Sequence, residues 1–262
     1  MKLMYNLVTG EFIKLKRYSI LWIGVVTVFC SVLLAAFQSS SGGTGDIRYE
    51  HLYNNVIWNN YSLAFPFLIV LIGGYLINRE FTDNTLKTVL TLPVSFRRLL
   101  LAKMITIGLL TTLFAVLSFL STFLLAMMFQ YKDLSWAFII KSMYQIIGVS
   151  VGNYIAVLPI IVYFSRKRNA FFTGVSLAFV YGFCGIFVAG RQLTDYYPVT
   201  AALGLLGYTG QEEAVYQLPI ALSSLLLMLV IAGLLMIRVP RYEQLTNKPR
   251  KQRPKKHRNR MK

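Results

Sequence analysis

Six long apolar stretches constrain this chain more than any other feature of its sequence. The hydrocarbon core of a bilayer is about 30 Å thick, so a helix needs about 20 mostly apolar residues to cross it. The segments between these stretches hold most of the charge. The sequence therefore predicts an all-α integral membrane protein with six transmembrane helices. We expect the spans at Tyr18–Gln38, Trp58–Asn78, Leu99–Phe129, Ser142–Phe164, Ala170–Gly190 and Leu218–Ile237.

The composition excludes an ordinary soluble domain. Hydrophobic residues make up 56% of the 262 residues and charged residues only 14%, against about 25% charged in soluble domains. A net charge of +17 indicates either nucleic acid or an anionic membrane surface as a partner. The basic residues flank apolar spans, which favours the membrane. Cys30 and Cys184 both lie inside spans and are interpreted as small hydrophobic residues, with no disulfide or metal-ligand spacing.

The distribution of Lys and Arg predicts that both termini face the cytoplasm. With the N-terminus inside, 23 of the 27 basic residues fall on the cytoplasmic side, as the positive-inside rule requires. The outside keeps four basic residues, and six of the ten acidic residues. An odd number of spans would place the basic C-terminal tail outside. The charge pattern therefore also supports six spans.

The two ends of the chain differ from the spans: the N-terminus is amphipathic and the C-terminal tail is basic. Residues 1–17 form an amphipathic pattern that predicts a helix lying along the inner leaflet; a frayed, solvated N-terminus is the alternative. Glu11 and Lys14 interrupt its apolar face, but their spacing lets them pair. The first span is too long for the 7–15-residue core of a signal peptide, so we expect a retained helix. Residues 239–262 form a basic, disordered tail attracted to anionic lipid rather than nucleic acid.

The loop after the second span has a pattern of its own. Thr82 or Asp83 can N-cap a short helix. Pro93 disfavours helical geometry before it, so this helix should end by about Thr91. Ser95 is then placed to N-cap the third span, whose first turns, with Lys103, we expect in the cytoplasm or the headgroup region. One face of the short helix carries Leu86, Val89 and Leu90. The pattern predicts an amphipathic cytoplasmic helix that either contacts a soluble partner or rests on the bilayer.

The run Glu80-x4-Thr85-x7-Pro93-x9-Lys103 resembles the loop of ABC transporter permeases of the type-2 exporter class. Those loops carry an acidic residue, Gly-Thr, a Leu-rich helix, Pro-Val-Ser, basic residues and a Lys that opens the third helix. Asn84 replaces the Gly of this pattern. The matching residues are Glu80, Thr85, Leu90, Pro93, Val94, Ser95, Arg97 and Lys103.

The resemblance implies a function for this loop. It implies that Asp83–Thr91 is a coupling helix seated in a cytoplasmic ATPase dimer, which binds ATP and Mg²⁺. It also implies a second permease, identical or a sister chain, and outward transport of a hydrophobic or cationic peptide or antibiotic across a bacterial cytoplasmic membrane. The ATPase-coupling residues would be Glu80, Asp83, Thr85, Leu86, Val89, Leu90, Pro93, Arg97 and Lys103.

The residues themselves predict no enzyme activity. The chain has no Gly-Lys dipeptide and hence no phosphate-binding P-loop, and no cofactor or metal site is expected. The centres of the spans carry no charged residue, which argues against an ion-coupled secondary transporter. Two alternatives to an ABC permease remain: a non-transporting scaffold or immunity protein, and a secondary transporter.

Small and polar residues within the fourth and fifth spans form patterns typical of close helix packing. They are interpreted as contacts within the bundle, as a dimer seam, or as part of a cargo path. These residues are Gly148, Ser150, Gly152, Asn153, Ala178 and Gly182. The segment 191–217 is long for an outer loop and is expected to be a tethered loop, or to hold a re-entrant or surface-lying helix.

Overall fold

The computed structural model describes residues 2–15, 18–40, 48–82, 95–165, 170–189, 193–208, 210 and 216–238. These residues form helices and connections, with no β-strand among them. The elements are α1 (Lys2–Leu15), α2 (Ile20–Ser40), α3 (Tyr49–Asn59), the π-helix η1 (Asn60–Ala64), α4 (Phe65–Thr82), α6 (Phe96–Met128), α7 (Trp136–Phe164), α8 (Phe171–Ala189), α9 (Pro198–Leu205) and α10 (Leu218–Ile237).

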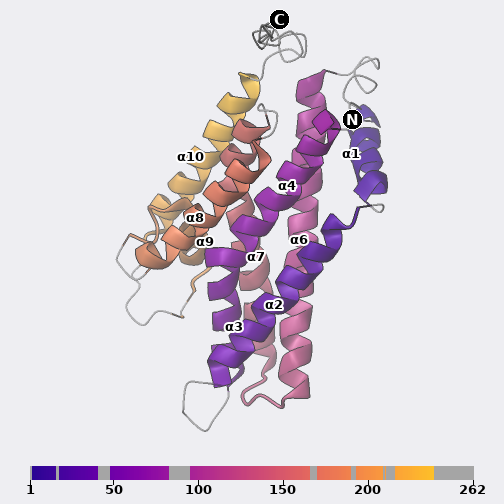
Figure 1. Cartoon of the computed structure of the whole chain (residues 1–262). Coiled ribbons are helices and arrows are strands. Elements are labelled where there is room, and N and C mark those ends of the chain that lie inside the picture. The colour runs from indigo at the N-terminus through magenta and orange to yellow at the C-terminus, as the bar shows by residue number, and fades with distance from the viewer. Residues whose placement is uncertain are drawn as a thin grey trace, which may run out of the picture.

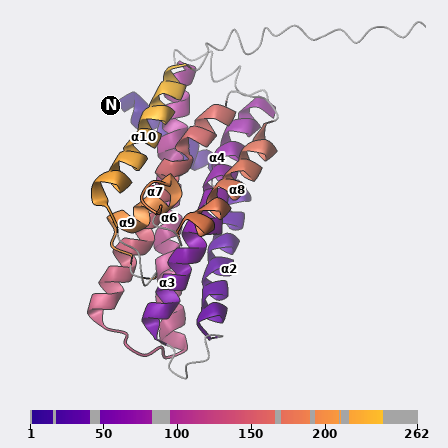
Figure 2. The ribbon, with the colours of Figure 1, turned by 90° about the vertical axis from the view of Figure 1, so that its left-hand side faces the viewer.

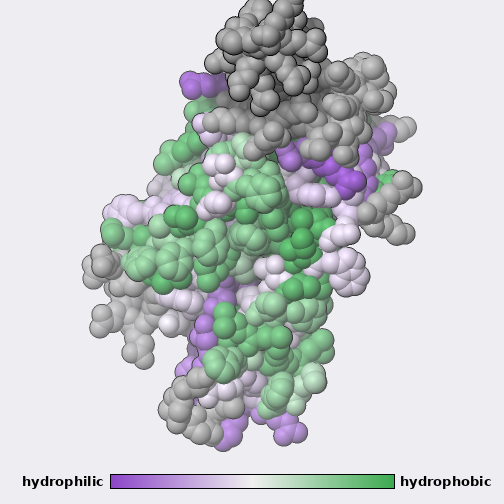
Figure 3. Space-filling view, in the orientation of Figure 1, coloured by the Kyte–Doolittle hydropathy of each residue, from purple (hydrophilic) through white to green (hydrophobic). Residues whose placement is uncertain are grey.

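Six of the described helical stretches are long and apolar enough to cross a bilayer, which confirms the predicted all-α membrane fold. Figure 1 shows α1 and the C-terminal end of α10 at the same end of the bundle, as an even number of spans requires. Figure 3 shows hydrophobic residues over most of the described face, with hydrophilic residues beside α1 and at the opposite end. Which end faces the cytoplasm stays a prediction from the charge pattern.

The second span begins earlier than its hydropathy predicts. It runs over Tyr49–Arg79, 31 residues, rather than from Trp58. Polar residues lower the hydropathy of its first turns, but the apolar residues among them recur at helical spacing. These apolar residues are buried among α2, α6 and α7. They are Tyr49, Leu52, Tyr53, Val56 and Ile57. The helix therefore continues because one face is covered by protein, and a mean over both faces does not detect this. The fourth span likewise begins at Trp136 rather than Ser142.

A π-helix joins α3 to α4, and the path of the chain bends there (Figures 1 and 2). Its cause lies in the sequence: Pro66 has no N–H, and its ring would collide with the carbonyl of Ser62 in a regular helix. One extra residue in the turn relieves this conflict, and the Phe65 N–H donates to the carbonyl of Asn60. Single-turn π-bulges inside α-helices are frequently found at functional sites. This bulge lies in the middle of the second span.

Gly182 lets α8 approach the bulge. A Cβ atom at this position would lie 2.5 Å from the carbonyl oxygen of Ser62 and 2.9 Å from the Pro66 ring. Neither group can move without shifting the backbone. We expect Gly182→Ala to lower the free energy of unfolding by roughly 1–3 kcal/mol through overpacking, measured as thermal stability in detergent. Gly233→Ala in α10 is the matched control, since nothing lies within 4 Å of its Cβ position. Equal stability of the two variants would contradict this explanation.

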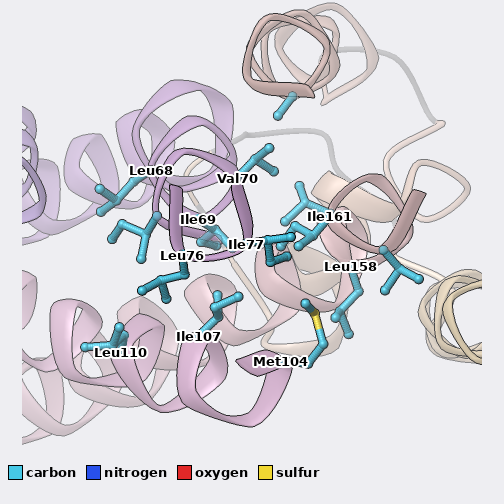
Figure 4. Close-up of a cluster of buried hydrophobic side chains, with 14 of the residues drawn as sticks. Leu68, Ile69, Val70, Leu76, Ile77, Met104, Ile107, Leu110, Leu158 and Ile161 are labelled. Carbon is cyan, nitrogen blue, oxygen red and sulfur yellow. The ribbon is translucent and has the colours of Figure 1, made fainter. Parts of the chain in front are cut away.

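The core lies between α4, α6 and α7. Figure 4 shows apolar side chains of these three helices meeting in one cluster. Helix association in lipid depends on such close van der Waals packing rather than on exclusion of water. The labelled members are Leu68, Ile69, Val70, Leu76, Ile77, Met104, Ile107, Leu110, Leu158 and Ile161. α4 also contacts α2 and α8, so it is the central helix of the bundle.

The short helix α9 lies inside the bundle. Seven of its eight residues are buried, and it packs against α7, α8 and α10. The turn after it is held by Gln145, whose Nε2 donates to the carbonyls of Leu206 and Gly207 at 3.0 Å each. This part of the 191–217 segment is therefore neither a surface-lying helix nor a plain loop.

Candidate functional site

The predicted coupling loop connects α4 to α6. At its start, Glu80 lies in the last turns of α4. At its end, Ser95 N-caps α6 by accepting a hydrogen bond from the Arg98 N–H at 3.4 Å, as predicted. Arg97 is exposed in the first turn of α6. The remaining predicted residues lie outside the described part of the chain, so the coupling helix stays a prediction: Asp83, Thr85, Leu86, Val89, Leu90 and Pro93.

Lys103 is buried in protein, although the sequence was interpreted as placing it in water or headgroups. It lies two turns into α6 and is only 2% exposed. Its ammonium group lies 2.6 Å from Oε2 of Glu11 in α1 and donates to the carbonyl of Leu76 in α4 at 3.3 Å. Glu11 is equally buried, at 2% exposed. A single ammonium group therefore joins three helices.

The face of α1 that carries Glu11 contacts protein. Leu15 is buried, and Met4, Leu7 and Val8 are partly buried on the same side, where α1 packs against α6. The sequence assigned this face to lipid, with Glu11 as an interruption. The structure instead makes Glu11 a contact residue. That α1 lies at the membrane surface stays a prediction.

Glu11 is held in its charged form by its neighbours. Burial alone raises the pKa of this carboxyl group, but the ammonium groups of Lys103 and Lys14 outweigh burial, so the pKa lies below its ordinary value of 4.5. Lys14 is 2.7 Å from Oε1, which confirms the pairing expected from the sequence. The Glu11 carboxylate is therefore ionised at neutral pH, 2.6 Å from the buried Nζ of Lys103.

A second contact extends this arrangement to α2. The guanidinium of Arg79, near the end of α4, lies 4.0 Å from the ring centroid of Tyr18, just before α2. Arg79 also donates a hydrogen bond to the hydroxyl of Tyr75 at 2.5 Å. Stacking of this kind contributes about 0.5–2 kcal/mol. We call the set formed by Glu11, Lys103, the Leu76 carbonyl, Arg79 and Tyr18 the α1 junction.

A groove opens on the side of the bundle between α2, the π-helix region and α8. Its cavity volume is about 350 Å³, which is in the range of small-molecule sites. Most of its wall is apolar, but three polar side chains reach it: Thr27, Ser31 and Asn59. We call this the lateral groove. Its lining consists of Val26, Thr27, Cys30, Ser31, Leu34, Asn59, Leu63, Ala64, Phe67 and Phe179.

Hydrogen bonds connect the floor of the lateral groove to the interior. Ser31 Oγ donates to Asn60 Oδ1 at 2.8 Å, and Asn60 Nδ2 donates to Ser118 Oγ of α6 at 3.0 Å. Asn59 Nδ2 donates to Gln38 Oε1 at 3.1 Å. We call these five residues the polar cluster. Because unpaired polar groups are costly in a membrane, the cluster fixes α2 and α6 to the bulge.

The small residues predicted as packing, seam or cargo positions face other parts of the same chain. A Cβ at Gly148 would lie 2.6 Å from the Leu206 side chain, and one at Gly152 would collide with Ala202 of α9. Gly182 faces the bulge. The side chains of Ser150 and Asn153 are buried, and so is Ala178. Ser150 Oγ donates to the Ile146 carbonyl at 2.7 Å.

Asn153 differs from the other residues of this set in its hydrogen bonding. Its side chain is fully buried, and neither amide atom has a hydrogen-bond partner within the part of the chain that the structure describes. It does not line the lateral groove.

The sequence did not predict the polar cluster or the pairing of Glu11 with Lys103. Adjacent amides, Asn59 and Asn60, inside an apolar span were the available signal for the cluster. For the junction, the signal was an acidic residue on an apolar helix face together with a lone Lys two turns into a span. Glu11 and Lys103 are 92 positions apart, so helical periodicity alone could not pair them.

A bundle of six candidate spans, with an N-terminal helix packed against α6, defines a multi-pass membrane protein. The chain belongs to the ABC-2 family of transporter proteins, whose model matches residues 7–185. It is also 25% identical, over 143 residues, to the bacitracin transport permease protein BCRB of Bacillus licheniformis. That match covers 52% of this chain and 68% of the relative. The resemblance seen in the loop is confirmed, and the chain is an ABC transporter permease subunit.

Proposed function

We propose that this permease moves a hydrophobic or cationic peptide or antibiotic out of the cell, powered by a separate ATPase subunit. Membership of the ABC-2 family supports a transport role, and the relative named as a bacitracin transport permease supports a peptide antibiotic as cargo. The observation that carries the proposal is the lateral groove, with its mixed lining and its opening on the side of the bundle.

The lining of the groove fits an amphipathic molecule. Phe67 and Phe179 offer aromatic surface, while Asn59 and Ser31 offer hydrogen-bonding groups within an apolar wall. A cargo entering from the bilayer brings its apolar part with it and needs polar partners for its amides, because lipid supplies none. A groove of this kind accepts such a molecule without a buried charge. No strongly selective contact is required.

The energy source is proposed to be a cytoplasmic ATPase that engages the loop between α4 and α6. Two permeases, identical or sister chains, would complete the transport unit, as is usual in this family. The basic tail would lie against anionic lipid, and the N- and C-termini would face the cytoplasm, in line with the positive-inside rule.

Filling the groove should block transport. We expect Val26→Trp to lower efflux of bacitracin about tenfold or more, because the added ring occupies the cavity where the cargo would bind. Val230→Trp on α10 is the matched control: both valines are 57% exposed, and Val230 does not line the groove. The measurement is the inhibitory concentration of bacitracin for cells that express the permease with its ATPase, at equal membrane abundance.

The outcomes separate the candidate functions. Resistance that needs the ATPase and falls only with Val26→Trp supports the proposal. Resistance that persists without any ATPase indicates a sequestering immunity protein, and loss on collapsing the proton gradient indicates a secondary transporter. Equal effects of the two tryptophans would show that the lateral groove is not the cargo path.

A further inference from the structure

We infer that Glu11 of α1 and Lys103 of α6 are positioning residues for energy coupling, which join both ends of the coupling loop to α1 so that loop movement reaches the lateral groove. The inference rests on the proposed function. It concerns contacts within this chain, on α1, α4 and α6, rather than the loop residues that would touch the ATPase.

The ion pair lies close to both ends of the loop. Lys103 is seven residues after Phe96, where α6 begins, and Leu76 is six residues before Thr82, where α4 ends. At 1.5 Å per residue, these distances are about 10 Å and 9 Å along the helices. Because Lys103 contacts both Glu11 and the Leu76 carbonyl, α4 and α6 cannot separate here without breaking a buried contact. The loop therefore acts on one connected unit.

The chemistry of the pair fixes the register of α1. An apolar contact tolerates sliding, whereas a buried ion pair at 2.6 Å is lost if α1 moves by one turn, about 5.4 Å. Apolar residues of similar volume would often give equal or greater stability in such a place. The use of charges is better explained by a need for one defined register, which is the best-attested use of buried polar groups.

The unit continues towards the groove. The Tyr18 N–H donates to the carbonyl of Leu15, the last residue of α1, at 2.9 Å, and the guanidinium of Arg79 lies over the Tyr18 ring. Val26, the first groove residue of α2, follows Tyr18 by eight positions. The contacts thus run from α4 and α6 near the loop, through α1 and Tyr18, to α2, which forms one wall of the lateral groove. Packed side chains, ion pairs and rigid helices of this kind can carry energetic coupling between distant sites.

The test measures the reactivity of a residue in the lateral groove and needs no cargo. Cys30 lines the groove, and Cys184 is the second cysteine of the chain. In a Cys184→Ser background, the permease is purified with its ATPase, and the reaction rate of Cys30 with a membrane-permeant maleimide is compared without nucleotide and with ATP and vanadate. We expect a nucleotide-dependent change of about fivefold or more in the otherwise unaltered complex. Glu11→Gln should reduce it to less than about twofold, with ATP hydrolysis and subunit association kept.

Two further variants separate positioning from folding. Lys103→Arg keeps a cationic hydrogen-bond donor for the Glu11 carboxylate and the Leu76 carbonyl, so it should keep most of the nucleotide response. Asp133→Asn is the matched control, because Asp133 pairs with Arg48 at 3.4 Å in an exposed ion pair, and it should leave the response unchanged.

The possible results differ in what they overturn. A full nucleotide response in Glu11→Gln, or in a folded Glu11→Gln, Lys103→Met double variant, would overturn the inference and leave the proposed function intact. A complex without any nucleotide response at Cys30, or a chain that binds no ATPase, would instead contradict the proposed function. The inference would then fall with it.

Discussion

Replacing Leu86 and Leu90 by aspartate should abolish ATP-driven transport while the protein still inserts into the membrane. Both residues lie on the predicted apolar face of the short helix between α4 and α6. If that face sits in a cleft of the ATPase, two carboxylates there would be buried without partners, and each would cost several kcal/mol. We expect transport to fall by about a hundredfold or more. The measurements are ATPase co-purification and efflux at equal membrane abundance.

The control places the same charges on the opposite side of the helix. At 100° per residue, Thr88 and Thr91 point away from the Leu86 face. The Thr88→Asp, Thr91→Asp variant should therefore bind the ATPase and transport nearly normally. Full transport by the Leu86→Asp, Leu90→Asp variant would show that this helix does not couple the subunits. Equal loss in both variants would indicate that the loop is sensitive to charge in general.

The sequence was sufficient for the number of spans, because lipid permits few alternatives. Each crossing helix must be about 20 residues long and mostly apolar, and this rule identified all six spans. It failed at Tyr49–Ile57, where one helix face is buried in protein and the other carries polar residues. Whether one face of a helix is buried depends on tertiary packing, and mean hydropathy does not report that packing.

The site was less predictable than the fold. Ser95 was found as an N-cap because capping is local. Lys103 was found through a family pattern, but its burial and its partner in α1 were not. The polar cluster depends on a bulge whose cause, Pro66, was visible in the sequence, whereas the meeting of Asn60 with Ser31 and Ser118 was not. Contacts between helices depend on how the bundle packs, and this packing could not be predicted from a single sequence.

The second span takes part in both the lateral groove and the α1 junction. The bulge and the polar cluster of that span border the groove, and its C-terminal end holds Leu76 and Arg79 at the junction. The same continuous helix thus links the predicted coupling loop to the candidate cargo site. This arrangement makes α4 the central element through which loop movement and groove shape are related.

Removal of Lys103 alone should be the most destabilising single change in the α1 junction. Lys103→Met leaves the Glu11 carboxylate buried without its main partner, and breaking a buried pair in this way costs about 3–5 kcal/mol. Lys14 remains 2.7 Å away, so we expect the lower end of that range. The Glu11→Gln, Lys103→Met double variant removes both charges and should stay within about 1 kcal/mol of the unaltered protein. Unfolding in detergent measures both.

The pH dependence provides a second check on the same variant. In the unaltered protein, the pKa of Glu11 lies below 4.5, so its contribution to stability is present above that pH and is lost as pH falls through the lowered pKa. Without Lys103, burial becomes the main influence and raises the pKa of Glu11. Lys103→Met should then lose stability as pH rises, because the folded state must release a proton that burial favours. The stability gap between the two proteins should therefore widen from acidic to neutral pH, and a gap that does not change with pH would show that the lost ion pair is not the cause.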